Sequence, residues 1–390
     1  MRQEKKKIAF VLTSFVVGGV EKSFLDLYDS IDKERYDITV FLPDEKGEWT
    51  SLLQQKCDVR FLRIEDYRTV IMSQLKQLQL FGACRSLFFR ILARLNYERN
   101  YRKSTEYFIR SMPRVKQMFD CVVAYQVIND DCVLGSLYRL KAPKKVVWSH
   151  TYIHKEEKLY RKWYDKFDRL FCVSRFARNA LVDNFPFLVE KTEVFYNVVK
   201  PDRIQCLAEE PARVDRSDAV MLTTVGRLSE EKGQRMIPRI ACLLLDAGYH
   251  IKWYLIGDGE LRKVIEQEIE TQRVQDAVIL LGNRDNPYPY MKACDIYVQT
   301  SLVEGWGLTV SEAKILHKPI VTTDAGVMSE QIQSGVNGII VLDNNPETLA
   351  AEIGRLIDHP ELRDAFVRQL QREDVGHRGE IEKLYAVFEQ

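Results

Sequence analysis

The chain contains the stretch Glu304-Gly-Trp-Gly-Leu-Thr-Val-Ser-Glu312-Ala313, directly downstream of the apolar segment Ile296–Gln299. The apolar segment has the length and composition of a buried strand, and the residues after the Gly-Trp-Gly turn have the pattern of a helix. N–H groups at the start of such a helix, with its dipole, favour a diphosphate, and glycines let that ligand approach the main chain. Glu304, just ahead of the turn, is placed to accept hydrogen bonds from sugar hydroxyls. Glu312, two turns into the helix, is placed to accept them from a ribose. In the alternative interpretation, both glutamates are ordinary helix residues.

Strand-like and helix-like segments alternate along the chain, both before and after this stretch. In the first half the expected strands are Ile8–Leu12, Ile38–Leu42, Val59–Leu62, Cys121–Tyr125, Val146–Trp148, Leu170–Val173 and Glu193–Tyr196. In the second half they are Val220–Val225, Lys252–Ile256, Ala277–Leu281, Ile296–Gln299, Pro319–Thr322 and Gly338–Val341. This alternation predicts an α/β protein with two Rossmann-like, doubly wound parallel sheets. Ligands of such folds bind at the carboxyl ends of the strands, which predicts a central cleft between two facing domains.

The length of 390 residues also favours two domains, because one hydrophobic core rarely extends so far. We expect an N-terminal domain over 1–198 and a C-terminal domain over 219–375, with the final segment 376–390 as a helix. Between the domains, 199–218 contains Pro201 and Pro211 and has no periodicity, which predicts a linker.

Composition excludes several classes of protein. Lysine and arginine (57) nearly balance aspartate and glutamate (56), which argues against a nucleic-acid partner. The eight cysteines are scattered without C-x-x-C pairs, as is typical of reduced thiols in a cytoplasmic protein. The apolar run Ile8 to Val20 leads into a helix pattern and is predicted to be a first strand rather than a secretory signal. No stretch approaches the ~20 apolar residues of a membrane span.

Two further turns lie between a strand and a helix. In Val225-Gly226-Arg227-Leu228-Ser229-Glu230-Glu231-Lys232-Gly233, the cations Arg227 and Lys232 are spaced to converge on phosphate oxygens. The alternative is an exposed turn with Ser229 as helix cap. The second turn, Gly257-Asp258-Gly259, is glycine-rich but lacks the full G-x-G-x-x-G pattern.

Taken together, these segments resemble glycosyltransferase family 4, a large family of retaining enzymes with the GT-B fold. The matching residues are Gly18-Gly19-Val20-Glu21, His150 after Val146-Val147-Trp148-Ser149, Val173-Ser174-Arg175, Gly226-Arg227-Leu228 with Lys232-Gly233, Gly257-Asp258-Gly259, and the stretch from Glu304 to Glu312. They run in family order over nearly the whole chain. The resemblance implies transfer of a hexose or N-acetylhexosamine from a nucleotide-sugar, with UDP as the commonest nucleotide and GDP second. The acceptor would be a saccharide or a lipid-linked molecule in cell-surface polysaccharide or glycolipid synthesis.

The resemblance also implies roles for individual residues. Arg227 and Lys232 would neutralise the departing diphosphate, Glu304 would bind the transferred sugar, and His150 would face that sugar near the reacting carbon. Glu312 would anchor the ribose. The remaining residues expected to bind the nucleotide-sugar are Gly18, Gly19, Gly257, Gly259, Arg284, Gly305, Gly307, Leu308 and Thr309. The family's last helix returns to the N-terminal domain, which we therefore expect of 376–390.

No metal or cofactor is expected. The sequence has no pair of aspartates at D-x-D spacing, so Arg227 and Lys232 would take the role of a divalent cation at the phosphates. Three alternatives stay open at this point. A dehydrogenase would need a phosphate fingerprint after the first strand, which this chain lacks. A GT-B epimerase or phosphorylase would share the fold, and a catalytically silent GT-B subunit would only bind a partner.

A mostly helical excursion over 68–119 interrupts the first domain. Its part Arg85–Lys116 holds nine basic residues, opposed by Glu98 and Glu106, and interleaved with aromatic and aliphatic side chains. Such a mixture is typical of helices that lie on an anionic membrane surface. We therefore expect peripheral association with the inner face of the cell membrane. The alternatives are a solvated helical face and an acidic polysaccharide as partner.

Overall fold

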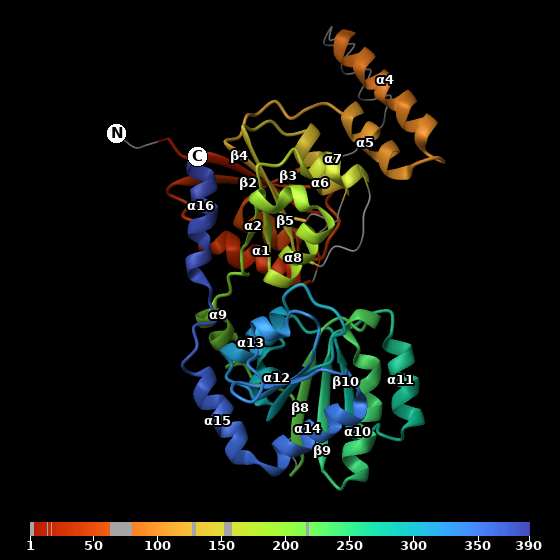
Figure 1. Cartoon of the computed structure of the whole chain (residues 1–390), viewed down its shortest axis with the longest axis vertical. Coiled ribbons are helices and arrows are strands. Elements are labelled where there is room, and N and C mark those ends of the chain that lie inside the picture. The colour runs from red at the N-terminus through yellow and green to blue at the C-terminus, as the bar shows by residue number, and fades with distance from the viewer. Residues whose placement is uncertain are drawn as a thin grey trace. The chain divides into compact units, whose positions relative to one another are not determined.

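The computed structural model describes residues 4–13, 15–16, 18–62, 80–126, 130–151, 158–215 and 218–390. The chain divides into two compact units (Figure 1). Unit 1 comprises Met1–Val198 together with Arg378–Gln390, and unit 2 comprises Val199–His377. Each unit is built on one parallel sheet, as the alternation of strands and helices predicts.

The sheet of unit 1 has seven strands in the order β3-β2-β1-β4-β5-β6-β7. Their bounds are β1 (Lys6–Val11), β2 (Tyr36–Leu42), β3 (Asp58–Phe61), β4 (Cys121–Ala124), β5 (Lys144–Ser149), β6 (Arg169–Cys172) and β7 (Thr192–Val194). All neighbouring strands are parallel. Because β1 lies beside both β2 and β4, the strand order reverses at β1, and such a switch point opens a crevice for ligands.

The helices of unit 1 are α1 (Gly19–Ser30), α2 (Thr50–Lys56), α4 (Leu80–Asn96), α5 (Tyr101–Ser111), α6 (Asp130–Tyr138), α7 (Lys158–Tyr164), α8 (Arg175–Asn184), α16 (Ile381–Glu389) and the short 3-10 helices η1 (Pro186–Lys191) and η5 (Arg378–Glu380). Among the described residues, side-chain caps begin two of these helices. Asn100 accepts a hydrogen bond from the N–H of Lys103 in α5, and Ser174 accepts one from the N–H of Ala177 in α8. Each cap satisfies an N–H that has no partner within the helix.

The sheet of unit 2 has six parallel strands in the order β10-β9-β8-β11-β12-β13. They are β8 (Val220–Val225), β9 (Ile251–Ile256), β10 (Val278–Gly282), β11 (Ile296–Gln299), β12 (Ile320–Thr323) and β13 (Ile339–Val341). Its helices are α9 (Pro201–Leu207), α10 (Ile237–Asp246), α11 (Arg262–Thr271), α12 (Tyr288–Ala293), α13 (Leu308–Ile315), α14 (Pro346–Asp358) and α15 (Pro360–Leu370), with 3-10 helices η2 (Glu230–Lys232), η3 (Gln234–Met236) and η4 (Met328–Glu330).

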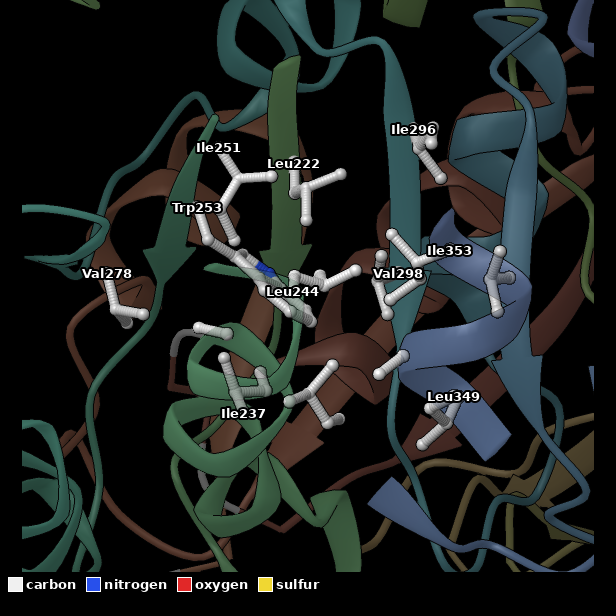
Figure 2. Packing of buried hydrophobic residues seen from close by; sticks show 14 of the residues in the cluster. Leu222, Ile237, Leu244, Ile251, Trp253, Val278, Ile296, Val298, Leu349 and Ile353 are labelled. Carbon is white, nitrogen blue, oxygen red and sulfur yellow. The ribbon is translucent and has the colours of Figure 1, made fainter. Parts of the chain in front are cut away.

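The core of unit 2 forms where α10 and α14 pack on the sheet (Figure 2). Trp253 of β9 is fully buried there, and its indole N–H donates to Thr224 Oγ1 of β8 at 3.0 Å. That bond satisfies the one polar group of the indole, so the ring buries its large apolar area without an unpaired donor. This packing holds the strand ends that carry the candidate site.

Each of the thirteen expected strands is present, with bounds within two residues of those expected. The linker expectation over 199–218 needs correction, because this segment belongs to unit 2 and contains α9, which packs on α12 and α13. Pro201 begins α9 instead of breaking it, since proline is well suited to the first turn of a helix. The part of the expected basic excursion over 68–79 lies outside the described residues.

The chain end packs on unit 1. The ring of Tyr385 in α16 stacks on Tyr36 of β2 with centroids 5.1 Å apart. Tyr36 also donates its hydroxyl to Glu389 Oε1 at 2.6 Å, and Lys6 Nζ lies 3.1 Å from Glu389 Oε2. These contacts join the last helix to the first two strands of unit 1.

Candidate functional site

The sheet order of unit 2 places the two most informative loops side by side. β8 lies between β9 and β11, so the strand order reverses between β8 and β11. The loop after β8 carries Arg227 and Lys232, and the loop after β11 carries Glu304 and leads into α13. Since parallel strands end at the same sheet edge, both loops lie at the switch point, where ligands bind in doubly wound sheets.

Backbone contacts tie these two loops together. Gly233 has a left-handed backbone (φ 64°), and a Cβ there would meet the carbonyl oxygen of Thr300 at 2.1 Å. Thr300 Oγ1 donates to the carbonyl of Lys232 at 2.9 Å, and the N–H of Leu302 donates to the carbonyl of Glu231 at 2.8 Å. Glycine is therefore required at 233, both for its conformation and for the close approach. The contacts set the position of the Lys232 side chain.

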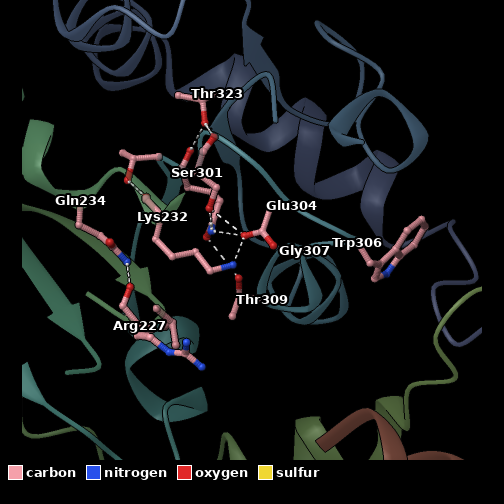
Figure 3. Close-up of polar contacts among 12 residues, drawn as sticks. Arg227, Lys232, Gln234, Ser301, Glu304, Trp306, Gly307, Thr309 and Thr323 are labelled. Carbon is pink, nitrogen blue, oxygen red and sulfur yellow. Dashed lines mark hydrogen bonds and ion pairs between the residues drawn. The ribbon is translucent and has the colours of Figure 1, made fainter. Parts of the chain in front are cut away.

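Lys232 and Glu304 form an ion pair between the loops (Figure 3). The distance from Lys232 Nζ to Glu304 Oε1 is 2.6 Å, and the Glu304 side chain is only 8% exposed. Ser301 Oγ donates to the same carboxylate oxygen at 2.8 Å. Within the part of the chain that the structure describes, Glu304 Oε2 makes no such bond, and Figure 3 shows it directed away from Lys232. The contacts of Oε1 with Lys232 and Ser301 thus fix the position of the carboxylate, while Oε2 can accept hydrogen bonds from a ligand.

Gln299, a residue that the sequence analysis missed, orients this carboxylate. Its Nε2 donates to Glu304 Oε1 at 3.3 Å and to Ser301 Oγ at 2.6 Å. Its Oε1 accepts from Tyr297 OH at 2.8 Å and from Thr309 Oγ1 at 3.2 Å. The signal for it was present, because Gln299 is a polar residue at the carboxyl end of the apolar strand Ile296–Gln299. Its partners depend on the tertiary structure.

Gly307 is the N-cap residue directly before α13, and its backbone is left-handed (φ 83°). A Cβ at this position would meet Met328 Cε at 2.8 Å, so a side chain is disfavoured here both sterically and conformationally. The preceding Trp306 donates its indole N–H to Ser311 Oγ at 2.9 Å, and Ser311 Oγ donates to Gln331 Oε1 at 2.7 Å. This network fixes the turn before α13, whose first N–H groups have no acceptor within the helix.

The two glycine-containing turns after β8 and β9 pack backbone to backbone. Cβ atoms at Gly257 and Gly259 would meet the carbonyl oxygens of Gly226 and Leu228 at 2.0 and 2.4 Å. These two glycines, expected to bind the nucleotide-sugar, are thus required by the packing of the chain on itself. The contact supports the turn that carries Arg227, which is exposed.

The remaining candidates of unit 2 differ in burial. Glu312 lies in α13, is 2% exposed and accepts a hydrogen bond from Tyr288 OH of α12 at 3.3 Å. Arg284 follows β10, is exposed, and donates to the carbonyl of its neighbour Asn283 at 3.1 Å. Gly305, Leu308 and Thr309 surround the start of α13. Glu312, in the middle of α13, is thus buried, whereas Arg284 is exposed to solvent.

The N-terminal candidates lie in unit 1. Gly18 caps α1 and Gly19 is its first residue, with the carboxylate of Glu21 folded back to 2.5 Å from where a Gly18 Cβ would stand. His150 follows β5, and its ring lies 4.4 Å from that of Tyr125, centroid to centroid. Burial lowers the pKa of His150 to about 3, which a backbone hydrogen bond with Tyr125 only partly opposes. The imidazole is neutral at physiological pH.

His150 Nε2 is buried and has no hydrogen-bond partner among the described residues. A neutral imidazole in this condition suits a hydrogen bond with a ligand better than proton abstraction. Over the described ranges, no group of three or more His, Cys, Asp or Glu side chains is arranged to hold a metal ion. In the same ranges, no helix is long and apolar enough to cross a membrane.

Comparison with known proteins finds a family-model match within the second unit. Residues 209–372 match the family model described as Glycosyl transferases group 1. This range contains every candidate residue of unit 2. A similar curated protein is an uncharacterized glycosyltransferase, MJ1059 of Methanocaldococcus jannaschii, with 30% identity over 169 residues, which is 42% of each chain. Another is the N-acetylgalactosamine-N,N'-diacetylbacillosaminyl-diphospho-undecaprenol 4-alpha-N-acetylgalactosaminyltransferase of Campylobacter jejuni, 25% identical over 52% of this chain and 54% of that protein.

The chain spans about half the length of these curated relatives. Solved structures match over both units. Anabaena HepE in complex with UDP and glucose has a TM-score of 0.71 at 20% identity, covering 98% of this chain and 99% of HepE. TarM, a Staphylococcus aureus protein, has a TM-score of 0.70 at 15% identity, covering 99% of both chains. The chain therefore has the GT-B fold, and the matches together support a glycosyltransferase family.

Proposed function

We propose that this protein is a glycosyltransferase that moves a hexose or N-acetylhexosamine from a UDP-sugar to a saccharide or lipid-linked acceptor, with retention of the anomeric configuration. The observation that carries the proposal is the ion pair of Lys232 with Glu304 next to the N-terminus of α13, at the switch point of the sheet. The family match over the same residues supports it. Family 4 and the retaining outcome rest on the motif resemblance.

The leaving group explains the cations. When the bond from the anomeric carbon to a nucleoside diphosphate breaks, negative charge develops on the departing oxygen, and fixed donors near that oxygen lower the barrier. In this proposal the exposed guanidinium of Arg227, the ammonium of Lys232 and the first N–H groups of α13 contact the diphosphate. Lys232 then lies between the phosphate and Glu304, with its ammonium 2.6 Å from Glu304 Oε1. No metal is needed for this arrangement.

The carboxylates and the histidine bind the sugars. Glu304 Oε2 accepts hydrogen bonds from hydroxyls of the transferred sugar, while Oε1 stays bound to Lys232, Ser301 and Gln299. Glu312 accepts from the ribose. His150, neutral because of its low pKa, acts as a hydrogen-bonding group at the donor sugar and not as a general base.

Names of relatives support the acceptor class. The Campylobacter jejuni relative is named for a diphospho-undecaprenol acceptor, and another from Staphylococcus aureus, 25% identical over 42% of this chain, is named as a capsular polysaccharide biosynthesis glycosyltransferase. We therefore propose a role in cell-surface polysaccharide or glycolipid synthesis. The proposed UDP nucleotide is likewise supported by the HepE complexes.

Thermal shift against UDP, GDP, ADP and their sugar conjugates tests the proposal, because a ligand that binds only the folded state raises the melting temperature. We expect UDP and UDP-sugars to raise it, and Arg227→Ala and Glu312→Gln to reduce that rise. The exposed Lys263 of α11, changed to Ala, is the matched control. If none of the nucleotides shifts the wild type, the proposed donor is wrong. If donor alone is converted to a different sugar nucleotide, an epimerase replaces the transferase.

A further inference from the structure

The outer face of α4 is apolar and exposed to solvent. Leu87, Phe88, Ile91 and Leu95 are spaced as neighbours on one side of a helix, and Phe88 and Leu95 are 57% and 66% exposed. Tyr97 and Tyr101, in the turn to α5 and at its start, are exposed as well, and their rings lie 6.1 Å apart. We call these six residues the apolar face. A cluster of large exposed apolar groups marks an interaction surface.

The opposite side of α4 is already used. Phe89 stacks on Tyr107 of α5 with ring centroids 6.2 Å apart, and Ser104 of α5 donates its hydroxyl to the carbonyl of Ala93 at 2.8 Å. Figure 1 shows α4 outermost, with α5 between it and the rest of unit 1. The apolar face is therefore not the side by which α4 packs on unit 1.

A buried carboxylate anchors α5 and thus the whole hairpin. Glu106 is 1% exposed and accepts hydrogen bonds from Tyr138 OH of α6 at 2.7 Å and Trp163 Nε1 of α7 at 3.2 Å. Arg110 lies 3.3 Å from it. The acidic residue Glu106 is consequently part of the interior, which leaves Glu98 as the exposed acid between residues 85 and 116.

The structure also sorts the basic residues of this segment. Arg90 lies over the ring of Phe108 at 4.3 Å, Arg102 is 3.6 Å from Asp130, and Arg110 pairs with Glu106. By contrast, Arg94, Arg99 and Lys103 are exposed and form no ion pair within the described residues. They lie in the sequence next to Leu95, Tyr97 and Tyr101. One end of the hairpin thus combines cations with amphipathic rings and a bulky aliphatic residue.

From this geometry we propose that the α4–α5 hairpin docks on the surface of an anionic lipid bilayer, with the apolar face in the headgroup region and Arg94, Arg99 and Lys103 on lipid phosphates. Two partners could cover the apolar face, a second copy of this chain or a bilayer, and charge favours the bilayer. A second copy of this chain would bring the same three cations to the interface, where like charges repel, whereas an anionic bilayer attracts them. Tyrosine side chains also favour the boundary between a bilayer and water, because the ring is apolar while its hydroxyl can stay hydrated.

Cosedimentation with vesicles tests the proposal without donor or acceptor, so its result is independent of the proposed function. We expect binding to phosphatidylglycerol mixed with phosphatidylcholine, weaker binding at high salt, and little binding to phosphatidylcholine alone. The triple change Arg94→Glu, Arg99→Glu and Lys103→Glu should lower partitioning by at least roughly a hundredfold, at about fivefold per cation. The triple change Phe88→Ser, Ile91→Ser and Leu95→Ser should lower it more than about tenfold.

A matched control variant makes the same change of charge, three cations to glutamate, on the surface of unit 2. Lys263, Arg368 and Arg372 are exposed in unit 2, and their triple change to Glu should leave vesicle binding intact. Circular dichroism and donor cleavage in solution should match the wild type for all three variants, since each changed side chain is exposed. The proposal is wrong if the wild type stays in the supernatant at low salt, or if the control loses as much binding as the hairpin variant. A dimer that disappears in the Phe88, Ile91 and Leu95 variant would also overturn it, in favour of a second copy.

Discussion

Lys232 Nζ lies 2.6 Å from Glu304 Oε1, which joins two loops that are 72 residues apart in the sequence. The distance is that of a charge-assisted hydrogen bond. Because the pair also contacts Ser301 and, through Glu304, Gln299, its two charges are held next to the first turn of α13. Lys232 and Glu304 should consequently act as one unit toward a ligand.

We predict that Glu304→Gln and Lys232→Ala each reduce turnover on the order of 10²–10³-fold, because each removes one fixed electrostatic contact from the site. The double variant should lose much less than the product of the two losses, since both residues belong to one ion pair. Release of nucleoside diphosphate from a UDP-sugar measures turnover, and Lys263→Ala serves as the surface control. If either single variant turns over at nearly the wild-type rate, the proposed roles of Lys232 and Glu304 are wrong.

Gln299→Leu should lower kcat by about tenfold or more while leaving the affinity for UDP nearly unchanged. Leucine fills a similar volume but cannot donate to Glu304 Oε1 or accept from Thr309, so the carboxylate loses its orientation. The split between kcat and UDP affinity separates this effect from unfolding. A parallel drop in melting temperature and UDP binding would mean that Gln299 only stabilises the fold.

Activity should persist in excess EDTA, because Arg227 and Lys232 are proposed to balance the charge of the diphosphate. The measurement compares UDP release before and after chelation, with magnesium and manganese added back. A loss of activity on chelation that either ion restores would contradict the proposed role of the cations.

Glu106→Gln should destabilise unit 1 by about 1–3 kcal/mol at neutral pH. The reason is that Tyr138 OH and Trp163 Nε1 then donate to a neutral amide, which is a weaker hydrogen-bond acceptor than the buried carboxylate. Burial raises the pKa of Glu106, but the bonds from Tyr138 and Trp163 and the charges of Lys162 and Arg110 outweigh it and lower the pKa.

The sign of the pH dependence follows from that lowered pKa. Stability from Glu106 is fully present above the unfolded pKa of about 4.3 and is lost as the pH falls through the folded value. The difference in melting temperature between wild type and variant should therefore be large at pH 7 and shrink below about pH 4. Glu98→Gln, at an exposed position of the same segment, should show no such difference. An equal difference at both pH values would assign the effect to packing alone.

Local patterns in the sequence were sufficient to predict the thirteen strands of this fold. Strands such as Val220–Val225 and Ile296–Gln299 are predictable because a short apolar run bounded by turn residues has few alternatives in an α/β chain. The Glu304 to Glu312 stretch is equally local, since a glycine turn and a helix start are neighbours in sequence. Pro201 shows the limit of this approach, because proline is compatible with both a linker and a helix start, and packing of α9 on α12 and α13 decided between them.

By itself, then, the sequence determined the parallel α/β architecture and which residues at the strand ends carry charge. The tertiary structure decided which of those residues meet: Lys232 with Glu304, and Gln299 with the same carboxylate. It also decided that Arg102 and Arg110 are paired, while Arg94 and Arg99 face solvent. The physical reason is that periodicity and turn chemistry act between neighbours along the chain, whereas strand order and ion pairing are set by packing between segments that are far apart in sequence.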